Sequence, residues 1–119
     1  MSRVVSVRVP SVLERAVYAN ANRSKMLTSQ IVGLILEHSV SGHYDFSRLT
    51  DEEFLDAKLD VRLADELVTK LHLISKSLRV SVSVYIRTIL YAYYSKRLVF
   101  VERNGHYTLE ENHEQTTGA

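Results

Sequence analysis

The chain of 119 residues contains no cysteine, no tryptophan and only one proline. The absence of cysteine excludes a disulfide framework and any metal site or catalysis that depends on a thiolate. No apolar run approaches the roughly 18 residues that a membrane-spanning helix needs. No charged, apolar and small-residue pattern typical of a signal peptide opens the chain. We therefore expect an intracellular, cytoplasmic protein with no membrane partner.

Signatures of catalysis are also missing. The sequence has no glycine-rich phosphate loop, no Ser-His-Asp arrangement in a supporting context and no pair of carboxylates in an apolar setting. The histidines show none of the paired spacings typical of metal ligands. They are His38, His43, His72, His106 and His113. We expect neither an enzyme nor a cofactor or metal site.

Charge is distributed unevenly although the net charge is only +1. Residues 1–42 carry a charge of +3 and residues 57–97 carry +5, whereas residues 43–56 carry −4 and residues 98–119 carry −3. Two basic segments are thus joined and followed by acidic ones. This pattern suits a polyanionic partner.

The two basic segments resemble each other. Residues 4–9 and 58–63 alternate between apolar and polar side chains, which is typical of a strand with one buried face, and each has an arginine at the same place. Each strand precedes two helical patterns. The residues expected to face inward on the last helices are Leu27, Ile31, Leu34 and Ile35 in the first copy and Val82, Ile86, Ile89 and Leu90 in the second. When these sets are aligned, the offset between the copies is 54 residues at the strands and 55 at the last helices. A unit this small cannot bury its own apolar face. The two units must therefore pack against each other to form a common core.

The sequence predicts five segments. They are a first strand-helix-helix unit at 1–42, an acidic linker at 43–56, a second unit at 57–97, a β-hairpin at 98–111 and a disordered tail at 112–119. Thr50-Asp51-Glu52-Glu53 in the linker has the acidic character of a helix N-terminus. The hairpin rests on Asn104-Gly105 between two alternating stretches.

The strand, helix, turn and helix in each copy resemble the ribbon-helix-helix family of DNA-binding regulators. The resemblance rests on Arg8-Val9-Pro10 and Thr28-Ser29-Gln30-Ile31 in the first copy and on residues 80–87 in the second. It implies a mainly α fold with short β segments, in which two tandem β-α-α units share an antiparallel two-stranded ribbon and a four-helix core. A prokaryotic, archaeal, plasmid or viral origin suits such a chain. The two copies are expected to pair within one chain, with exchange between two chains of a homodimer as the alternative.

The resemblance also assigns residues. A two-stranded ribbon fits the DNA major groove, so the six polar-side positions of the strands are the expected base-reading residues. They are Val4, Ser6, Arg8, Lys58, Asp60 and Arg62. Solvated strand residues without a ligand are the alternative, and Asp60 is the least suited of the six because phosphates repel a carboxylate.

Phosphates are expected at the N-terminus of the second helix of each copy, where backbone N–H groups lack partners. The residues expected there are Arg23, Lys25, Thr28, Arg79, Ser81 and Ser83. Ser81 is also a good N-cap, which is the simpler interpretation of that residue. In the first copy Met26 takes the place of the cap, so Ser24 or Thr28 is expected to cap the helix instead.

The function expected from these patterns is sequence-specific binding of double-stranded DNA by a transcriptional regulator, with repression as the expected mode. Such units could associate further along DNA, and the hairpin could either dock on the core or join them. The alternative is an antitoxin-type interaction module in which the hairpin and acidic tail bind a protein and DNA binding is auxiliary. A helix-turn-helix reader is disfavoured because residues 84–94 are largely apolar or tyrosine.

Overall fold

The structure is a computed structural model that describes residues 1–49 and 54–112. Its elements follow one another in a simple order. They are β1 (Ser2–Val9), α1 (Ser11–Ser24), α2 (Thr28–Ser39), the 3₁₀ helix η1 (Phe46–Arg48), β2 (Ala57–Ala64), α3 (Asp65–Leu78), α4 (Val82–Tyr94), β3 (Leu98–Arg103) and β4 (His106–Glu111).

Strands β1 and β2 pair antiparallel over their whole length, from Ser2 opposite Ala64 to Val9 opposite Ala57. Their alternating sequences separate two faces. Val7, Val9, Leu59, Val61 and Leu63 are buried, while the residues between them are exposed. The predicted strands and their antiparallel pairing are confirmed, and both strands belong to one chain.

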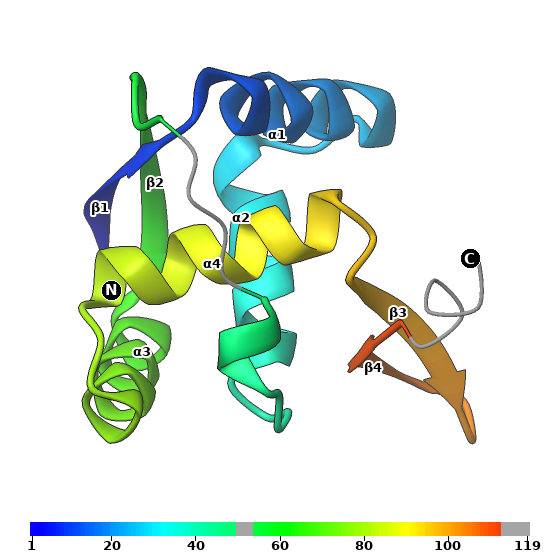
Figure 1. The fold of residues 1–119 in the computed structure, drawn as a ribbon. Helices are drawn as coiled ribbons and strands as arrows, with labels where there is room; N and C mark the ends of the chain where they lie inside the picture. Colours follow the sequence, from blue (N-terminus) through cyan, green and yellow to red (C-terminus); the bar gives the residue numbers. More distant parts are fainter. Residues whose placement is uncertain (50–53, 113–119) are drawn as a thin grey trace.

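The helices lie on the apolar side of this β1–β2 ribbon. Helices α2 and α4 cross at the centre of the molecule, α1 and α3 lie above and below in the view, and the β3–β4 hairpin is at the opposite end from the ribbon (Figure 1). Helix α2 packs beside β2 and α4 beside β1. The core is therefore filled mainly by these two helices, through Ile31, Val32, Ile35 and Leu36 of α2 and Tyr85, Ile86, Ile89 and Leu90 of α4.

The connector between α2 and β2 belongs to the same core. Leu49 is only 1% exposed, and the Phe46 ring stacks on the buried Tyr85 ring with centroids 5.8 Å apart. The Tyr85 hydroxyl makes a hydrogen bond of 2.9 Å with the Ser39 hydroxyl inside the core. Burial raises the pKa of Tyr85, and the Ser39 hydrogen bond opposes that rise.

The hairpin also packs on the core. Its turn has Asn104 and Gly105 at φ 53° and 83°, the left-handed conformations that a two-residue turn of this kind requires. Leu98 and Leu109 are buried, and the Phe100 ring contacts the rings of His38 and Tyr93. The predicted hairpin is confirmed, and within this chain it docks on the core.

The expected fold class is wrong. A mainly α, tandem ribbon-helix-helix protein with short β segments was expected, but the described residues form a small compact α/β domain with four α-helices and two separate two-stranded antiparallel sheets, about 52% helical and 26% strand. The physical reason is that the apolar core is not confined to the repeated units. Leu49 of the connector and Leu98 and Leu109 of the hairpin belong to the same hydrophobic cluster as the ribbon and helices.

The inferred shift from 54 to 55 residues between the copies is also wrong. The N-caps Pro10 and Ala64, and again Leu27 and Ser81, lie 54 residues apart. With this constant offset Ile31 corresponds to Tyr85. Leu27 and Leu34, which were expected to face inward, are 70% and 45% exposed.

Two expectations fall outside the described residues: the helix N-terminus at residues 50–53, and the disorder of the tail from residue 113 onward. Within the part of the chain that the structure describes, no helix has the length and apolar character to cross a membrane.

The shared core leads to a first prediction. Leu109→Ala should lower the free energy of unfolding of the whole domain by about 2–5 kcal/mol, because a buried leucine is replaced by a cavity. Chemical denaturation followed by the circular dichroism of the helices measures this change. Tyr107→Ala is the matched control on the same strand, since Tyr107 is 59% exposed, and it should change stability by no more than about 0.5 kcal/mol. Helices that unfold at an unchanged denaturant concentration in Leu109→Ala would contradict the single core.

Candidate nucleic-acid interface

The face of the ribbon that points away from the helices is formed by three cross-strand pairs. Val4 lies opposite Arg62, Ser6 opposite Asp60 and Arg8 opposite Lys58. All six side chains are exposed. We call this set the outer face. Alternation along each strand turns these residues away from the core, so the structure brings all six expected base-reading positions onto one surface.

The two ends of the outer face differ in charge. One end holds two cations, Arg8 and Lys58, and the other holds Arg62 beside the apolar Val4. At the centre the Ser6 hydroxyl donates to Oδ1 of Asp60 at 2.5 Å, and Nζ of Lys58 lies 3.9 Å from Oδ2. Lys58 therefore offsets part of the negative charge of Asp60, which reduces the repulsion expected between this carboxylate and DNA phosphates.

The edges of the ribbon are held by side chains from α2 and α4. The backbone N–H of Arg62 donates to the Ser29 hydroxyl at 2.8 Å. The guanidinium of Arg87 donates to the backbone carbonyl of Arg8 at 2.9 Å. Outward-pointing N–H and C=O groups belong to the non-hydrogen-bonded pairs of an antiparallel ladder, in which side chains lie closest together. The outer face is therefore compact, and the beginning of α2 is fastened next to it.

The ends of the ribbon are joined to the helices that follow. Oδ1 of Asp56, just before β2, accepts the first backbone N–H of α1 from Ser11 at 2.8 Å. Nε of Arg3 pairs with Oδ1 of Asp65 at the start of α3 at 3.2 Å. These contacts fix where each helix departs from the ribbon.

Each pair of helices is joined by a turn that contains a cation in the left-handed conformation. Lys25 has φ 55° and Arg79 has φ 60°. The backbone N–H of the next residue donates to a carbonyl in the last turn of the first helix. Met26 donates to the Ala21 carbonyl and Val80 to the Ser75 carbonyl, both at 3.0 Å. The turn therefore ends the first helix and places an exposed cation two residues before the N-cap of the second.

The helix N-termini beyond these turns are capped differently. Ser81 caps α4, because its hydroxyl accepts the N–H of Val84 at 3.1 Å, and this expectation is confirmed. In the first copy neither Ser24 nor Thr28 caps α2. Leu27 is the N-cap and makes no side-chain cap bond, while its own N–H donates to Oε1 of Gln30 at 2.8 Å. The expectation failed because Leu27, not Met26, corresponds to Ser81.

The remaining expected phosphate residues surround these two N-termini. Arg23, Lys25, Arg79 and Ser81 are exposed, and Thr28 and Ser83 are half-buried at the beginning of α2 and α4. The first N–H groups of an α-helix have no partner inside the helix and carry the positive end of its dipole. The structure thus groups three of the six residues at each turn.

Sequence reasoning missed Ser29 and Arg87 as residues that hold the ribbon. Both lie on helices, and their partners are backbone atoms of strands far away in sequence, so periodicity gives no signal for them. A constant offset would have drawn attention to Ser29, because it corresponds to Ser83 in the other copy.

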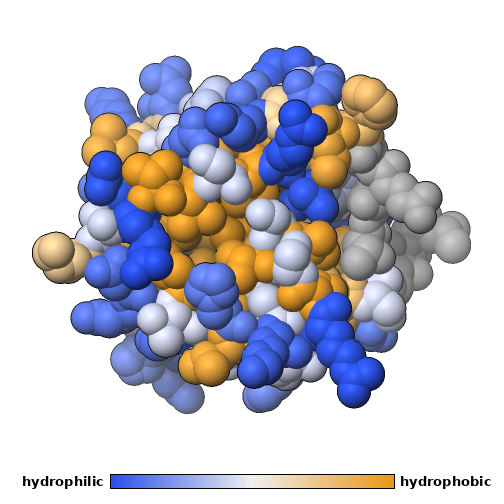
Figure 2. Space-filling view, turned by 90° about the vertical axis from the view of Figure 1, so that its left-hand side faces the viewer, coloured by the Kyte–Doolittle hydropathy of each residue, from blue (hydrophilic) through white to orange (hydrophobic). Residues whose placement is uncertain are grey.

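The surface around the ribbon is mixed in character. Figure 2 shows the side of the molecule that is on the left in Figure 1, with an apolar area near its middle and hydrophilic side chains around it. Val4 on β1 and Leu73 and Leu78 on α3 are among the exposed apolar residues. Among the described residues, no group of three or more histidine, aspartate or glutamate side chains could hold a metal ion.

The comparisons with known proteins identify no relative. The chain matches no protein-family model, no curated protein and no solved structure.

The Asp56 contact leads to a prediction on pH. The hydrogen bond from the Ser11 N–H holds the pKa of Asp56 below its ordinary value of 3.8. A carboxyl group with a lowered pKa in the folded state stabilises that state above its unfolded pKa, and the contribution is lost as the pH falls through the folded pKa. Asp56→Ala should therefore lower the Tm at pH 6, and the difference from wild type should shrink progressively as the pH falls below about 4.

Thermal unfolding between pH 2 and pH 7 measures this difference. Asp45→Ala serves as the control, because Asp45 is an exposed carboxylate of the same connector and its side chain accepts a hydrogen bond from Ser47 rather than from a helix N-terminus. A difference in Tm that stays constant down to pH 2 would show that Asp56 does not act through its charged form.

Proposed function

We propose that this protein binds double-stranded DNA sequence-specifically and acts as a transcriptional regulator, with repression as its mode of action. The observation that carries the proposal is the outer face, where six side chains stand in three matched pairs on a two-stranded ribbon. A ribbon of this width fits the major groove, where each base pair presents a distinct pattern of donors and acceptors.

The residues of the outer face have chemistries that suit base edges. Arg8 and Arg62 can each donate two hydrogen bonds to guanine O6 and N7, and Lys58 can donate to the same atoms. Asp60 can accept from cytosine N4, Ser6 can donate or accept, and Val4 can contact a thymine methyl group. Because the arginines lie at opposite ends of the outer face, the target should contain guanines on both sides of its centre.

Affinity that does not depend on sequence is assigned to the turns between the helices. Backbone N–H groups at the beginning of α2 and α4, with the side chains of Lys25, Arg79 and Ser81, suit phosphate oxygens. Arg23, Thr28 and Ser83 lie next to them. The Ser29–Arg62 hydrogen bond supports this arrangement, because it fastens the start of α2 to the ribbon.

The pairing of two different strands makes the outer face asymmetric. Arg8 and Arg62 correspond to each other, but Ser6 corresponds to Asp60 and Val4 to Lys58. A unit with its ribbon inside one chain should therefore prefer a non-palindromic site, unlike a homodimer of identical strands. Pairs of such units along DNA are part of the proposal, as is a cytoplasmic location where the chromosome or a plasmid is accessible.

Selection from a random double-stranded DNA library should return a non-palindromic site. Against that site, the double variant Arg8→Ala/Arg62→Ala should lose at least about 30-fold in discrimination from random DNA, because each bidentate contact contributes about 1–3 kcal/mol. Competition fluorescence anisotropy measures the discrimination. The variant should remain folded, since both side chains are exposed.

The control for this experiment is Arg15→Ala/Arg48→Ala, which removes the same charge at exposed positions outside the outer face and should leave discrimination unchanged. Selection of perfect palindromes only, or unaltered selectivity in the Arg8/Arg62 variant, would refute readout by the ribbon. Absence of any salt-sensitive DNA affinity, together with a stoichiometric protein partner, would favour the antitoxin-type module.

The phosphate contacts predict a different phenotype. Lys25→Ala/Arg79→Ala should weaken binding to all DNA sequences alike and reduce the slope of log Kobs against log salt by about 2, since each phosphate contact contributes about 0.9. Titrations between about 50 and 200 mM salt measure the slope. Lys70→Ala/Lys76→Ala is the control on α3, with an unchanged slope expected. A loss of affinity confined to the selected site would contradict this role.

A further inference from the structure

An open groove lies between α2, β2 and α3, on the side of the ribbon held by Ser29. Its cavity has a volume of about 390 Å³, and Gly33 of α2 is among the residues that line it. The floor is apolar, with Leu34, Leu63 and Leu67, and the polar groups at its border include Glu37 and Arg62. We call it the Gly33 groove. Its volume is within the range of about 300–1,000 Å³ that is usual for small-molecule sites.

In the other half of the molecule, the position that corresponds to Gly33 is occupied by an arginine. Arg87 stands 54 residues after Gly33, on α4. Its side chain crosses to β1, where the guanidinium donates to the carbonyl of Arg8 at 2.9 Å. Arg87 is only partly exposed, and burial lowers the pKa of its guanidinium from the ordinary value. The chain thus carries a guanidinium in the position that corresponds to the Gly33 groove.

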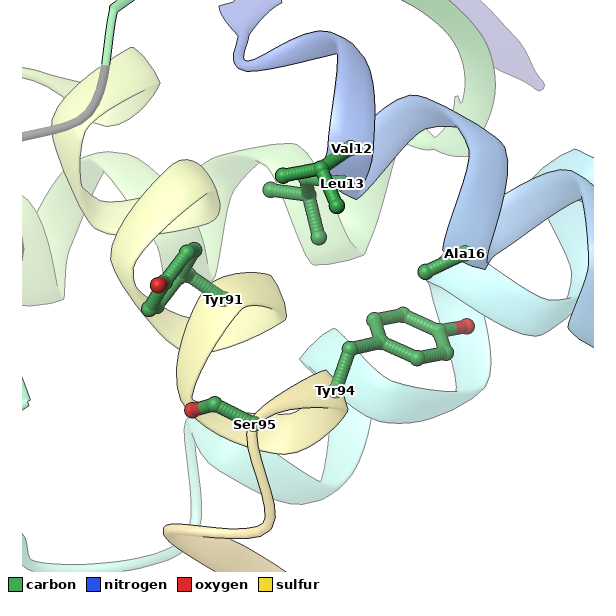
Figure 3. A pocket seen from close by; sticks show the side chains of 6 residues that line it. All are labelled: Val12, Leu13, Ala16, Tyr91, Tyr94 and Ser95. Atoms are coloured by element: carbon green, nitrogen blue, oxygen red, sulfur yellow. The ribbon is translucent and has the colours of Figure 1, made fainter.

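A smaller cavity of about 150 Å³ lies between α1 and α4. It overlaps the counterpart of the groove only at Leu13 and Tyr91. Leu13 and Ala16 of α1 line it from one side, and Tyr91 and Tyr94 of α4 with the C-cap residue Ser95 line it from the other (Figure 3). Tyr91 corresponds to Glu37 at the same offset of 54 residues. Arg87 and Tyr91 on α4 thus correspond to Gly33 and Glu37 on α2. The α2 side has no side chain at the first position and a carboxylate at the second.

The Gly33 groove presents the partners that a guanidinium requires. The carbonyl of Arg62 corresponds to the carbonyl of Arg8 that Arg87 contacts. The N–H of Arg62 points to the α2 edge of the ribbon, where Ser29 accepts it. The N–H and C=O of one strand residue point to the same edge, so the Arg62 carbonyl faces the groove as well. Glu37 supplies a negative charge, and guanidinium is suited to carboxylate and carbonyl acceptors together.

Space for such a ligand exists next to the helix. A Cβ atom added to Gly33 would meet one neighbour within 4 Å, the Cδ2 atom of Leu63 at 3.8 Å, which is an ordinary van der Waals contact. An alkyl chain can therefore lie along Leu34, Leu63 and Leu67 with its charged end at the ribbon edge. Met26, which is 36% exposed, borders the same groove.

We propose that the Gly33 groove binds a small alkylguanidinium compound of about the size of free arginine. Its guanidinium donates to the carbonyl of Arg62 and pairs with Glu37, and its methylene chain covers the apolar floor. This inference goes beyond the proposed function and does not depend on DNA binding. The groove borders the backbone of Arg62 on the outer face, so an occupied groove is in direct contact with the ribbon.

Isothermal titration of the full chain with free arginine tests the proposal, with citrulline and norvaline as matched ligands. Citrulline replaces the guanidinium by a neutral urea of nearly equal shape, and norvaline keeps the three-carbon side chain but has no polar group at its end. Arginine should bind at least about tenfold more tightly than citrulline, because charge-assisted hydrogen bonds are lost in the neutral analogue. Norvaline should bind more weakly still. Equal binding of arginine and citrulline, or no arginine binding at millimolar concentration, would overturn the proposal.

Variants locate the site. Gly33→Arg should abolish arginine binding by filling the groove as Arg87 fills its counterpart, and Glu37→Gln should weaken it about tenfold. Gly33→Ala is the control that keeps the groove open. It should bind arginine within about threefold of wild type and be somewhat more stable, because glycine destabilises a helix interior. Circular dichroism verifies that each variant is folded. Undiminished binding to folded Gly33→Arg would mean that arginine binds elsewhere.

Discussion

The antiparallel pairing of β1 with β2 is the interaction on which the rest of the structure depends. The strands alternate from Val5 to Val9 and from Lys58 to Leu63, so pairing produces an apolar face and a mainly polar face at the same time. A slip of one residue in the register would turn every side chain to the wrong side. Neither strand-helix-helix segment could cover its apolar residues alone at this size. The buried core and the exposed outer face therefore both follow from the alternation of residues along the two strands.

The helices stabilise the ribbon through its edges as well as through its buried face. A two-stranded sheet exposes unpaired backbone groups along both sides, which favours association with other strands. The Ser29 hydroxyl accepts a backbone N–H on one edge, and the Arg87 guanidinium donates to a backbone C=O on the other. These contacts also set the position of the helix N-termini relative to the outer face, so edge protection and the geometry of the candidate interface have a common cause.

Much of the local structure could be predicted from the sequence, because short-range patterns determine it. The two strands, the hairpin at Asn104-Gly105 and the Ser81 cap all follow from alternation or from turn and cap chemistry. The face of α2 could not be assigned in this way. Ile31, Val32, Leu34, Ile35 and Leu36 are all apolar, so helical periodicity permits two alignments that differ by one residue. Packing against the ribbon decides between them, and that is a tertiary constraint.

The prediction of the fold class was wrong for a related reason. The resemblance covered only the repeated segments, whereas Leu49, Leu98 and Leu109 complete the core from outside them. Leu49 stands alone among polar residues and gives no periodic signal, and the alternation of the hairpin does not show that Leu98 and Leu109 pack on the same core. The candidate site was more accessible to sequence reasoning, because alternation alone indicates which strand residues point outward. The contacts of Ser29 and Arg87 were not, since their partners are backbone atoms distant in sequence.

The covalent connection between β1 and β2 has a consequence for how the ribbon assembles. When two strands come from separate molecules, the ribbon forms in a bimolecular reaction and falls apart on dilution. Here both strands are in one chain, so formation is first order and the folded fraction is the same at a few molecules per cell as at millimolar concentration. A substitution in one strand also alters only one half of the outer face, so the two halves can diverge independently.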